Sequence, residues 1–342
     1  MSIRIAIIES STDAVNRIAH LLNCNADFDV AWTATTFELA MKKMAQDQPD
    51  LFLMGLALPD KATPDAIKDI KIHHAVPILA LDTEIGGRHQ KVFQCMGAGA
   101  IDVISIHPGM SETQALKVMT AKLVIMSKLV RASKGDFSLG QHHHKTKAAA
   151  PGQKKETLIA IGSSTGGPAA LSAILSNIPA NIEASFVLIQ HLDKQFAKGF
   201  IQWLGNHSVL PIQVAHVGDK PKVGTVLVAD QDDHLVLCAD GRLGYTPDPI
   251  DNPYRPSVDA FYNSVAKHWG GHAVGILLTG MGKDGGVGLL AMRKQTFHTI
   301  AEDKSTCVVY GMPKAAVELN AAIEILPLHK IASAIIKCIH RF

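Results

Sequence analysis

Short apolar runs alternate with helical patterns along the first 130 residues of the chain. The apolar runs lie at residues 3–8, 28–32, 51–58, 77–81 and 100–106. Apolar residues at helical spacing occupy residues 12–22, 37–46 and 116–130. The runs are rich in aliphatic residues and carry no alternating polar face, which is typical of strands buried on both sides of a parallel sheet. The pattern predicts an α/β domain with a doubly wound parallel sheet over residues 1–130.

A second α/β pattern starts after a segment that has no apolar periodicity. Residues 131–155 are mostly small, polar or basic and include Gly and Pro, which is typical of a linker. Within residues 156–342, the runs TLIAIG, SFVLIQH, AVGILL and TFHTIAED predict strands. The runs TVLVA and HLVLC predict short strands in a meander or hairpin around Asp240-Gly241. We therefore expect two doubly wound domains, residues 1–130 and 156–342, joined by a flexible linker.

Composition narrows the kind of protein without changing this picture. The 342 residues are 47% hydrophobic with a net charge of +2, which gives no support for a nucleic-acid or membrane-surface partner. No apolar run reaches the roughly 18–20 residues that span a bilayer. The five cysteines never occur as CxxC, so we expect no disulfide framework, no zinc site and a reducing cytoplasm. Three adjacent histidines, 142–144, define no metal geometry within a linker, and no cofactor is expected.

The segment Gly162-Ser163-Ser164-Thr165-Gly166 matches the pattern G-x-S-x-G directly after a predicted strand and at the start of a helix. Flanking glycines permit a sharp turn that displays Ser164, and the helix start offers free N–H groups to a developing oxyanion. This pattern is typical of a serine nucleophile. A phosphate-binding turn or a plain strand-to-helix connection remains an alternative on this motif alone.

A serine nucleophile needs a base and an acid that orients the base. His191 ends the next strand, and Asp284 follows a later strand in a Gly-rich turn. Because the carboxyl ends of parallel strands gather at one edge of a sheet, these residues can meet Ser164 there. The order Ser, His, Asp differs from that of α/β-hydrolases, which would pair Asp284 with a later histidine such as His298. His298 lies inside a predicted strand, so we favour His191.

Several blocks of the second half resemble the catalytic domain of the chemotaxis protein-glutamate methylesterases (CheB-type). These blocks are IAIGSSTGGP, LIQHL, RPSVDAF, AVGILLTGMGKDG and CVVYGMPKAA, and the resemblance covers residues 157–335. It implies Ser164 as nucleophile, His191 as base and Asp284 as orienting acid. It also implies backbone N–H groups near Thr165 and Met281 for the oxyanion.

The same resemblance implies a reaction and partners. The expected reaction is hydrolysis of glutamate γ-methyl esters on receptor cytoplasmic helices with release of methanol, and some members also deamidate glutamine. The expected partners are a methylated chemoreceptor-like protein and a chemotaxis-type histidine kinase complex. Arg255 matches a segment near the substrate face, although Pro256 to Asp259 also suggest a helix start that leaves Arg255 simply exposed. Ser163 stands where the family often has alanine, a difference that we expect to be harmless.

The first half resembles a response-regulator receiver, a flavodoxin-like fold, but departs from it where receivers bind Mg²⁺ and phosphate. The acidic pair after the first strand is reduced to Glu9-Ser10, and the phosphoacceptor position holds Gly55. The switch position holds Asp82 beside Thr83, and His107 replaces the phosphate-binding lysine. One acidic residue is a poor Mg²⁺ site, because this ion prefers several carboxylate oxygens. We therefore expect a pseudo-receiver that is not phosphorylated, with Asp50 and Asp60 as the nearby acids whose labelling would contradict this.

Two other functions remain open at this point. The first is an esterase or deamidase that acts on a small molecule with the same triad. The second is a signalling scaffold in which both halves have lost activity. The presence of Ser164, His191 and Asp284 together disfavours the scaffold.

Overall fold

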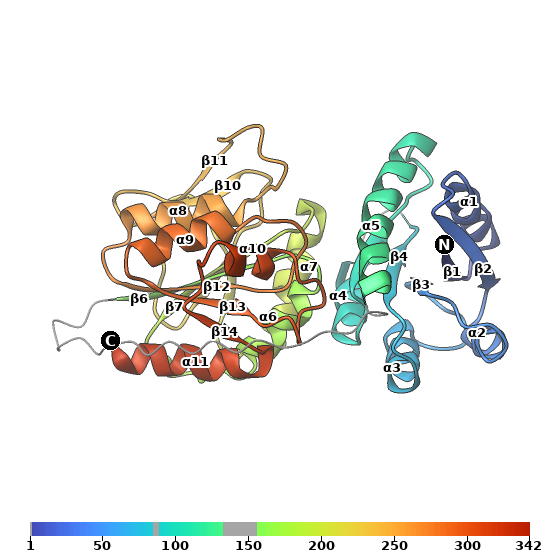
Figure 1. Ribbon diagram of the computed structural model, residues 1–342, viewed down its shortest axis with the longest axis horizontal. Coiled ribbons are helices and arrows are strands. Elements are labelled where there is room, and N and C mark those ends of the chain that lie inside the picture. The colour runs from blue at the N-terminus through green and yellow to red at the C-terminus, as the bar shows by residue number, and fades with distance from the viewer. Residues whose placement is uncertain (1, 85–88, 133–155) are drawn as a thin grey trace. The chain divides into compact units, whose positions relative to one another are not determined.

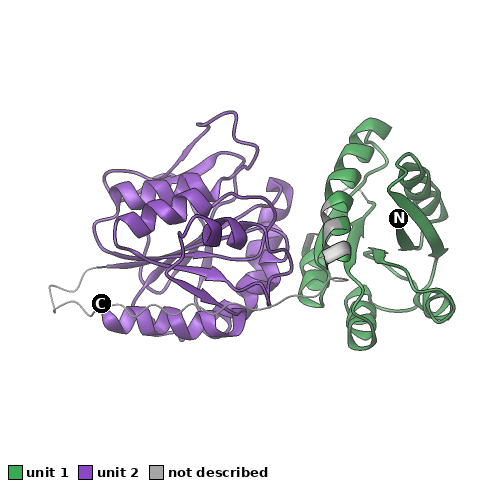
Figure 2. Cartoon of the chain, in the orientation of Figure 1, with its two compact units in different colours: residues 1–139 green, residues 140–342 purple. Residues whose placement is uncertain are grey.

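The computed structural model describes residues 2–84, 89–132 and 156–342. The chain divides into two compact units, residues 1–139 and 140–342 (Figures 1 and 2). The linker predicted over residues 131–155 lies outside the described residues, except that its first two residues still belong to a helix. Among the helices within these described ranges, none is both long enough and apolar enough to cross a membrane.

Unit 1 is a five-stranded parallel sheet with the strand order β2-β1-β3-β4-β5. Its strands are β1 (Ile3–Ile8), β2 (Phe28–Ala34), β3 (Leu51–Gly55), β4 (Ile78–Asp82) and β5 (Asp102–Ser105). Its helices are α1 (Thr12–Asn23), α2 (Phe37–Met44), α3 (Thr63–His73), α4 (His89–Gly97) and α5 (Glu112–Ala132). This order is the flavodoxin-like one, which confirms the receiver-like fold predicted for the first half.

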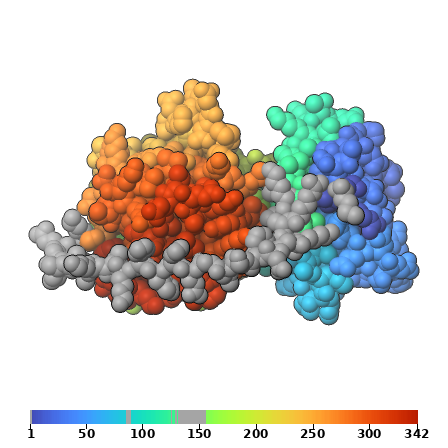
Figure 3. Space-filling model, in the orientation of Figure 1, coloured from blue at the N-terminus to red at the C-terminus, as the bar shows by residue number. Residues whose placement is uncertain are grey.

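Unit 2 is built on a seven-stranded parallel sheet with the order β14-β13-β12-β6-β7-β9-β8. These strands are β6 (Thr157–Ser163), β7 (Ser185–Gln190), β8 (Ile212–Val214), β9 (Val226–Val228), β12 (His272–Leu277), β13 (His298–Glu302) and β14 (Glu324–Leu326). A separate hairpin, β10 (His234–Leu237) and β11 (Leu243–Thr246), packs against α8 on one side of this unit (Figures 1 and 3).

Helices cover both faces of the seven-stranded sheet, as a doubly wound fold requires (Figure 1). One face carries α8 (Val258–His268), α9 (Gly286–Lys294) and α10 (Met312–Glu318), and the other carries α6 (Gly167–Leu175), α7 (Lys194–Gly205) and α11 (Leu328–Arg341). Every residue of β6 and β7 is buried, because these central strands are covered from both sides. The predicted fold class is thus confirmed in both halves.

The short run TVLVA does not belong to the hairpin that its position beside HLVLC suggested. It forms β9, which pairs in parallel with β7 and β8 in the main sheet. Strand β10 pairs instead with β11 across the turn at Asp240-Gly241. The prediction was wrong for TVLVA because all three residues of β9 are buried, and an apolar run this short carries no signal of its partner.

The strand order places a topological switch point at the end of β6. From β6 the chain first adds β7 on one side and later adds β12 on the other. Ligands of open parallel sheets bind at such a switch point, outside the carboxyl ends of the strands. The segments that follow β6, β7 and β12 are therefore the ones that can form a site.

Candidate active site

Ser164 lies in the turn between β6 and α6, at the switch point of the sheet. Its backbone N–H donates a hydrogen bond to the carbonyl oxygen of Thr279, which follows β12, at 3.1 Å. Gly166 precedes α6 with a φ of 80°, and a Cβ atom there would lie 2.7 Å from Cβ of Val308. Only glycine fits this left-handed and crowded position. The turn leaves Ser164 partly exposed, as a nucleophile must be.

His191 follows β7 and contacts Asp284 directly. Nε2 of His191 lies 2.7 Å from Oδ2 of Asp284, and the backbone N–H of His191 donates to the carbonyl of Ser163 at 3.0 Å. Because Nε2 bonds the carboxylate, Nδ1 is the ring nitrogen left to act as a base. Within the described part of the chain, no hydrogen bond joins Ser164 to the imidazole, and such bonds are often loose in ligand-free enzymes.

The Asp284 carboxylate lies at the N-terminus of α8. It accepts hydrogen bonds from the Ser257 hydroxyl (2.8 Å), the Val258 N–H (2.7 Å) and the Asp259 N–H (3.0 Å). Burial alone would raise the pKa of Asp284, but the bonds from His191 and from these N–H groups outweigh burial and hold it below its usual value. A carboxylate at a helix N-terminus is also favoured by the helix dipole. Asp284 therefore stays ionised and can stabilise a positively charged His191.

Asp259 is a second acid behind this site. Its carboxylate accepts the backbone N–H of Gly288 in α9 at 2.6 Å. Burial, reinforced by the nearby negative charge of Asp284, raises the pKa of Asp259 to about 6. The pKa values of the two carboxyl groups thus shift in opposite directions, because Asp284 receives several hydrogen-bond donors and Asp259 receives few.

Tyr254 stacks on the imidazole of His191, a contact that the sequence did not reveal. Its ring stacks on that of His191, with centroids 5.1 Å apart and an angle of 13° between the planes. A Cβ atom on Gly282 would lie 2.0 Å from the Tyr254 hydroxyl oxygen, so glycine makes room for this ring. The stack restricts rotation of the imidazole and shields one of its faces from water.

Gln190 joins the two turns that carry Ser164 and His191. Its Nε2 donates to the carbonyls of Ser164 (2.9 Å) and His191 (3.0 Å), and its Oε1 accepts the Ser163 hydroxyl at 2.7 Å. The side chain is almost completely buried. A signal was present in the sequence, because Gln190 is the one polar residue within the apolar run FVLIQ.

The backbone groups predicted for the oxyanion lie around Ser164. A Cβ atom on Gly280 would lie 2.8 Å from Cβ of Ser164, so the backbone just before Met281 packs closely against Ser164. Among the described residues, none accepts a hydrogen bond from the Met281 N–H. Thr165 is fixed on the other side, because its carbonyl accepts the Thr279 hydroxyl at 3.0 Å. The oxyanion role of Thr165 and Met281 stays a prediction.

Arg255 braces a loop of unit 2. Its guanidinium donates to the carbonyls of Pro247 (3.1 Å) and Ile250 (2.8 Å) and lies 3.6 Å from the Asp233 carboxylate. These contacts fix the loop next to Tyr254. A direct contact of Arg255 with substrate stays a prediction.

In unit 1, Glu9 occupies the space that a side chain at position 55 would need. A Cβ atom on Gly55 would lie 2.3 Å from Oε2 of Glu9, and that oxygen also accepts the Thr83 hydroxyl at 3.3 Å. The other oxygen of Glu9 accepts the Ser11 N–H at 3.0 Å. Both oxygens are engaged, which does not fit the free acidic pair that receivers offer to Mg²⁺. The absence of phosphorylation stays a prediction.

Asp50 and Asp60, the acids nearest the acceptor position in the sequence, are engaged elsewhere. The carboxylate of Asp60 accepts the backbone N–H groups of Phe37 and Glu38 at the start of α2, each at 2.9 Å. The carboxylate of Asp50 accepts the Arg4 N–H at 3.0 Å. Both therefore have structural partners that a phosphoryl group would displace.

Comparison with known proteins identifies the family to which this chain is similar. The family described as CheB methylesterase matches residues 159–335. A protein-glutamate methylesterase/protein-glutamine glutaminase of Mesorhizobium japonicum is 42% identical over 99% of both chains, and one of Cupriavidus metallidurans is 41% identical over 97% of both. The crystal structure of the Thermotoga maritima CheB methylesterase catalytic domain is 37% identical, with a TM-score of 0.52, over 54% of this chain and 99% of that one.

The fold and the site define an α/β protein with a candidate serine-hydrolase centre at the switch point of a parallel sheet. The family match spans more than half of the chain, and both relatives cover almost all of it. The chain belongs to the CheB methylesterase family.

Proposed function

We propose that this protein is a serine hydrolase that removes γ-glutamyl methyl esters from chemoreceptor-type signalling proteins and releases methanol. The hydrogen bond between His191 and the buried Asp284, beside a turn that displays Ser164, carries this proposal. The names of the relatives, which include glutamine glutaminase, support ester hydrolysis and also deamidation. The proposal places the enzyme in the cytoplasm, with a chemotaxis-type histidine kinase complex as a further partner.

The proposed reaction proceeds through an acyl-enzyme. Ser164 attacks the ester carbonyl while Nδ1 of His191 accepts the serine proton, and the same nitrogen then protonates the departing methoxide. A water molecule, deprotonated by His191, releases the glutamate carboxylate and restores Ser164. Asp284 keeps the ring proton on Nε2 and stabilises the imidazolium. Backbone N–H groups of Thr165 and Met281 are the proposed donors to the oxyanion.

The N-terminal unit is proposed to be a pseudo-receiver that regulates without an aspartyl phosphate. Gly55 offers no acceptor, and the Glu9 carboxylate fills the space beside it. Incubation of the full-length protein with a small-molecule phosphodonor should label none of residues 1–130. Acid-labile phosphate on Asp50 or Asp60 would contradict this part of the proposal.

The activity is tested with a Ser164→Ala variant, a methylated receptor fragment and a simple aryl ester. The variant should lose about 10³-fold or more of turnover, because it lacks the nucleophile. A matched control is Ser176→Ala, which alters an exposed serine at the end of α6 and should behave as wild type. Normal methanol release by Ser164→Ala would rule out the assignment. Hydrolysis of the aryl ester alone would instead favour the small-molecule esterase.

A fluorophosphonate probe separates the enzyme from the scaffold. It should label wild type and Ser176→Ala at one site and fail to label Ser164→Ala. A wild-type protein that is folded but not labelled would be a catalytically silent scaffold.

A further inference from the structure

A histidine, a glutamate and a cysteine converge at the sheet edge opposite the candidate active site. His298 starts β13, Glu324 starts β14, and Cys338 lies on the buried side of α11. One ligand atom from each residue lies within 4.8 Å of the other two. Because His298 and Glu324 occupy the amino ends of parallel strands, this cluster is separate from the residues that follow β6, β7 and β12.

The three side chains are close together, and the contact between His298 and Glu324 is an ion pair that is not well aligned as a hydrogen bond. Nε2 of His298 lies 2.7 Å from Oε1 of Glu324, yet this buried nitrogen makes no aligned hydrogen bond with any described residue. The Cys338 residue is only 3% exposed, and the His298 side chain is 13% exposed. Buried polar groups in folded proteins usually have aligned partners. The three ligand atoms are close enough to one another to share a common centre.

We propose that His298, Glu324 and Cys338 bind a divalent transition-metal ion of the zinc type. Imidazole nitrogen, carboxylate oxygen and thiolate sulfur are the three ligand types that Zn²⁺ takes in proteins. Tetrahedral bonds of about 2.0–2.3 Å place the ligand atoms roughly 3.3–3.8 Å apart, so small side-chain shifts complete the geometry. The Glu324 side chain is 36% exposed, which leaves the fourth position open to water.

Charged groups of both signs lie at the cluster. Burial alone would lower the pKa of His298, but interaction with Cys338 and Glu324 outweighs burial and raises it to about 9. Lys337 and Arg341 of α11 are the positive groups that face Glu324.

Bound metal would join three elements that are far apart in the sequence. It would attach the C-terminal helix α11 to the last two strands of the sheet, β13 and β14. A ligand that binds only the folded state raises stability according to its concentration relative to its Kd. Zn²⁺ should therefore raise the Tm of unit 2 without changing its fold.

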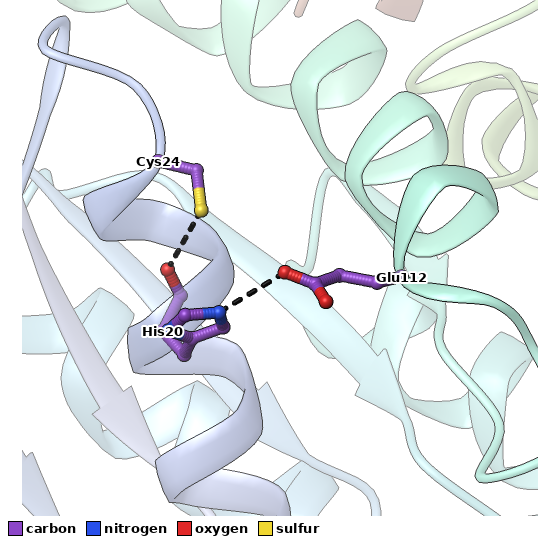
Figure 4. A group of neighbouring side chains, drawn as sticks. All are labelled: His20, Cys24 and Glu112. Carbon is purple, nitrogen blue, oxygen red and sulfur yellow. Dashed lines mark hydrogen bonds and ion pairs between the residues drawn. The ribbon is translucent and has the colours of Figure 1, made fainter.

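Unit 1 offers an exposed cluster of the same residue types, which serves as an internal comparison. His20 and Cys24 come from the end of α1, and Glu112 starts α5 (Figure 4). Here the side chains already have partners: Nε2 of His20 bonds Glu112 at 3.0 Å, and the Cys24 thiol donates to the His20 carbonyl at 3.4 Å. All three residues are exposed, so holding them around a metal costs more side-chain entropy than at the buried cluster.

Co²⁺ is the probe for the proposal, because a thiolate ligand gives it a charge-transfer band in the near ultraviolet. Full-length protein is stripped with a chelator and titrated with Co²⁺. We expect one Co²⁺ per chain with this band, displacement by Zn²⁺, and a rise in Tm. The histidines at 142–144 contribute no thiolate, so Co²⁺ bound there gives no such band.

Two cysteine variants decide between the clusters. The band should disappear in Cys338→Ser and remain in the matched control Cys24→Ser. Glu324→Gln keeps the thiol and changes a partly exposed residue, so it tests the site if Cys338→Ser does not fold; it should weaken Co²⁺ binding by about tenfold or more. Absence of the band in wild type, its loss only in Cys24→Ser, or unchanged affinity in Glu324→Gln would overturn the proposal. None of these outcomes depends on the hydrolase function.

Discussion

Replacing Asp284 with asparagine tests the orientation of the proposed base. The carboxylate accepts four hydrogen bonds, from Ser257, Val258, Asp259 and His191. An asparagine oxygen in place of Oδ1 still accepts from Ser257 and Asp259. The amide nitrogen then faces the Val258 N–H and Nε2 of His191, where two acceptor bonds have been lost.

The expected effects differ in size for stability and for catalysis. Loss of the charged acceptor for the Val258 N–H should cost about 1.5–3 kcal/mol of unfolding free energy. The new amide donates to Nε2 of His191, which moves the ring proton to Nδ1. A protonated Nδ1 cannot accept the proton of Ser164, and an equivalent exchange in a serine protease lowers kcat about 10⁴-fold. We expect a fall in kcat of about 10³–10⁴-fold for Asp284→Asn.

Ser257→Ala is the matched control. It removes one hydrogen bond to the same carboxylate and the N-cap of α8, at a cost of about 1 kcal/mol, but it keeps the negative charge beside His191. Methanol release from a methylated receptor fragment gives kcat, and urea denaturation gives stability. The control should keep kcat within about tenfold of wild type. A similarly small loss in Asp284→Asn would refute the proposed orientation of the histidine.

Three further predictions follow from close contacts and pKa values. Gly280→Ala places a Cβ atom 2.8 Å from Cβ of Ser164, so fluorophosphonate labelling should slow by about 10²-fold; labelling at the wild-type rate would contradict this. The raised pKa of Asp259, about 6 instead of 3.8, means that its stabilising effect is complete below pH 3.8 and is lost as the pH rises through 6. The unfolding free energy should therefore fall more between pH 4 and pH 7 in wild type than in Asp259→Asn. An equal fall in the two proteins would show that Asp259 does not titrate in this range. Gly55→Asp should lower the Tm of unit 1, because its Cβ atom meets Glu9 at 2.3 Å, and adding Glu9→Ala should restore part of the loss. If Gly55→Asp alone is as stable as wild type, the Glu9 side chain moves away without cost.

The candidate triad could be predicted from the sequence because it depends on a simple property of parallel sheets. Ser164, His191 and Asp284 each follow an apolar run, and parallel strands bring their carboxyl ends to one edge. The same logic predicted the fold class in both halves. The pairing of β9 could not be predicted, because a three-residue apolar strand has no feature that selects its neighbours.

The surroundings of the triad depend on contacts that no local pattern encodes. Asp284 is held by the start of α8, which lies about 27 residues earlier in the chain, as the separation from Ser257 shows. The PSVD segment predicted a helix start, but nothing in it indicated which carboxylate the helix receives. The contact between Glu9 and the space beside Gly55 was also not predictable from a local pattern. It depends on how far the Glu9 side chain reaches from the end of β1 to the neighbouring strand β3.

Glu302 is connected through Thr279 to the turn that carries Ser164, so a substitution of Glu302 tests how that turn is supported. Its Oε2 accepts the Thr279 N–H at 2.8 Å, and the Thr279 carbonyl accepts the Ser164 N–H. The residue is fully buried, and its Oε1 has no hydrogen-bond partner among the described residues. Burial, reinforced by the charge of Asp303, raises the pKa of Glu302.

Glu302→Gln keeps an oxygen for the Thr279 N–H and removes the titration. Because the raised pKa stabilises the folded state only while Glu302 is protonated, wild type should lose stability as the pH rises above 4.5. Urea denaturation across this range should show the glutamine variant gaining stability relative to wild type, while its kcat stays within about tenfold. Parallel stability profiles would mean that Glu302 titrates as it does in the unfolded chain. A large loss of kcat would mean that the carboxyl group, and not only its acceptor oxygen, positions Ser164.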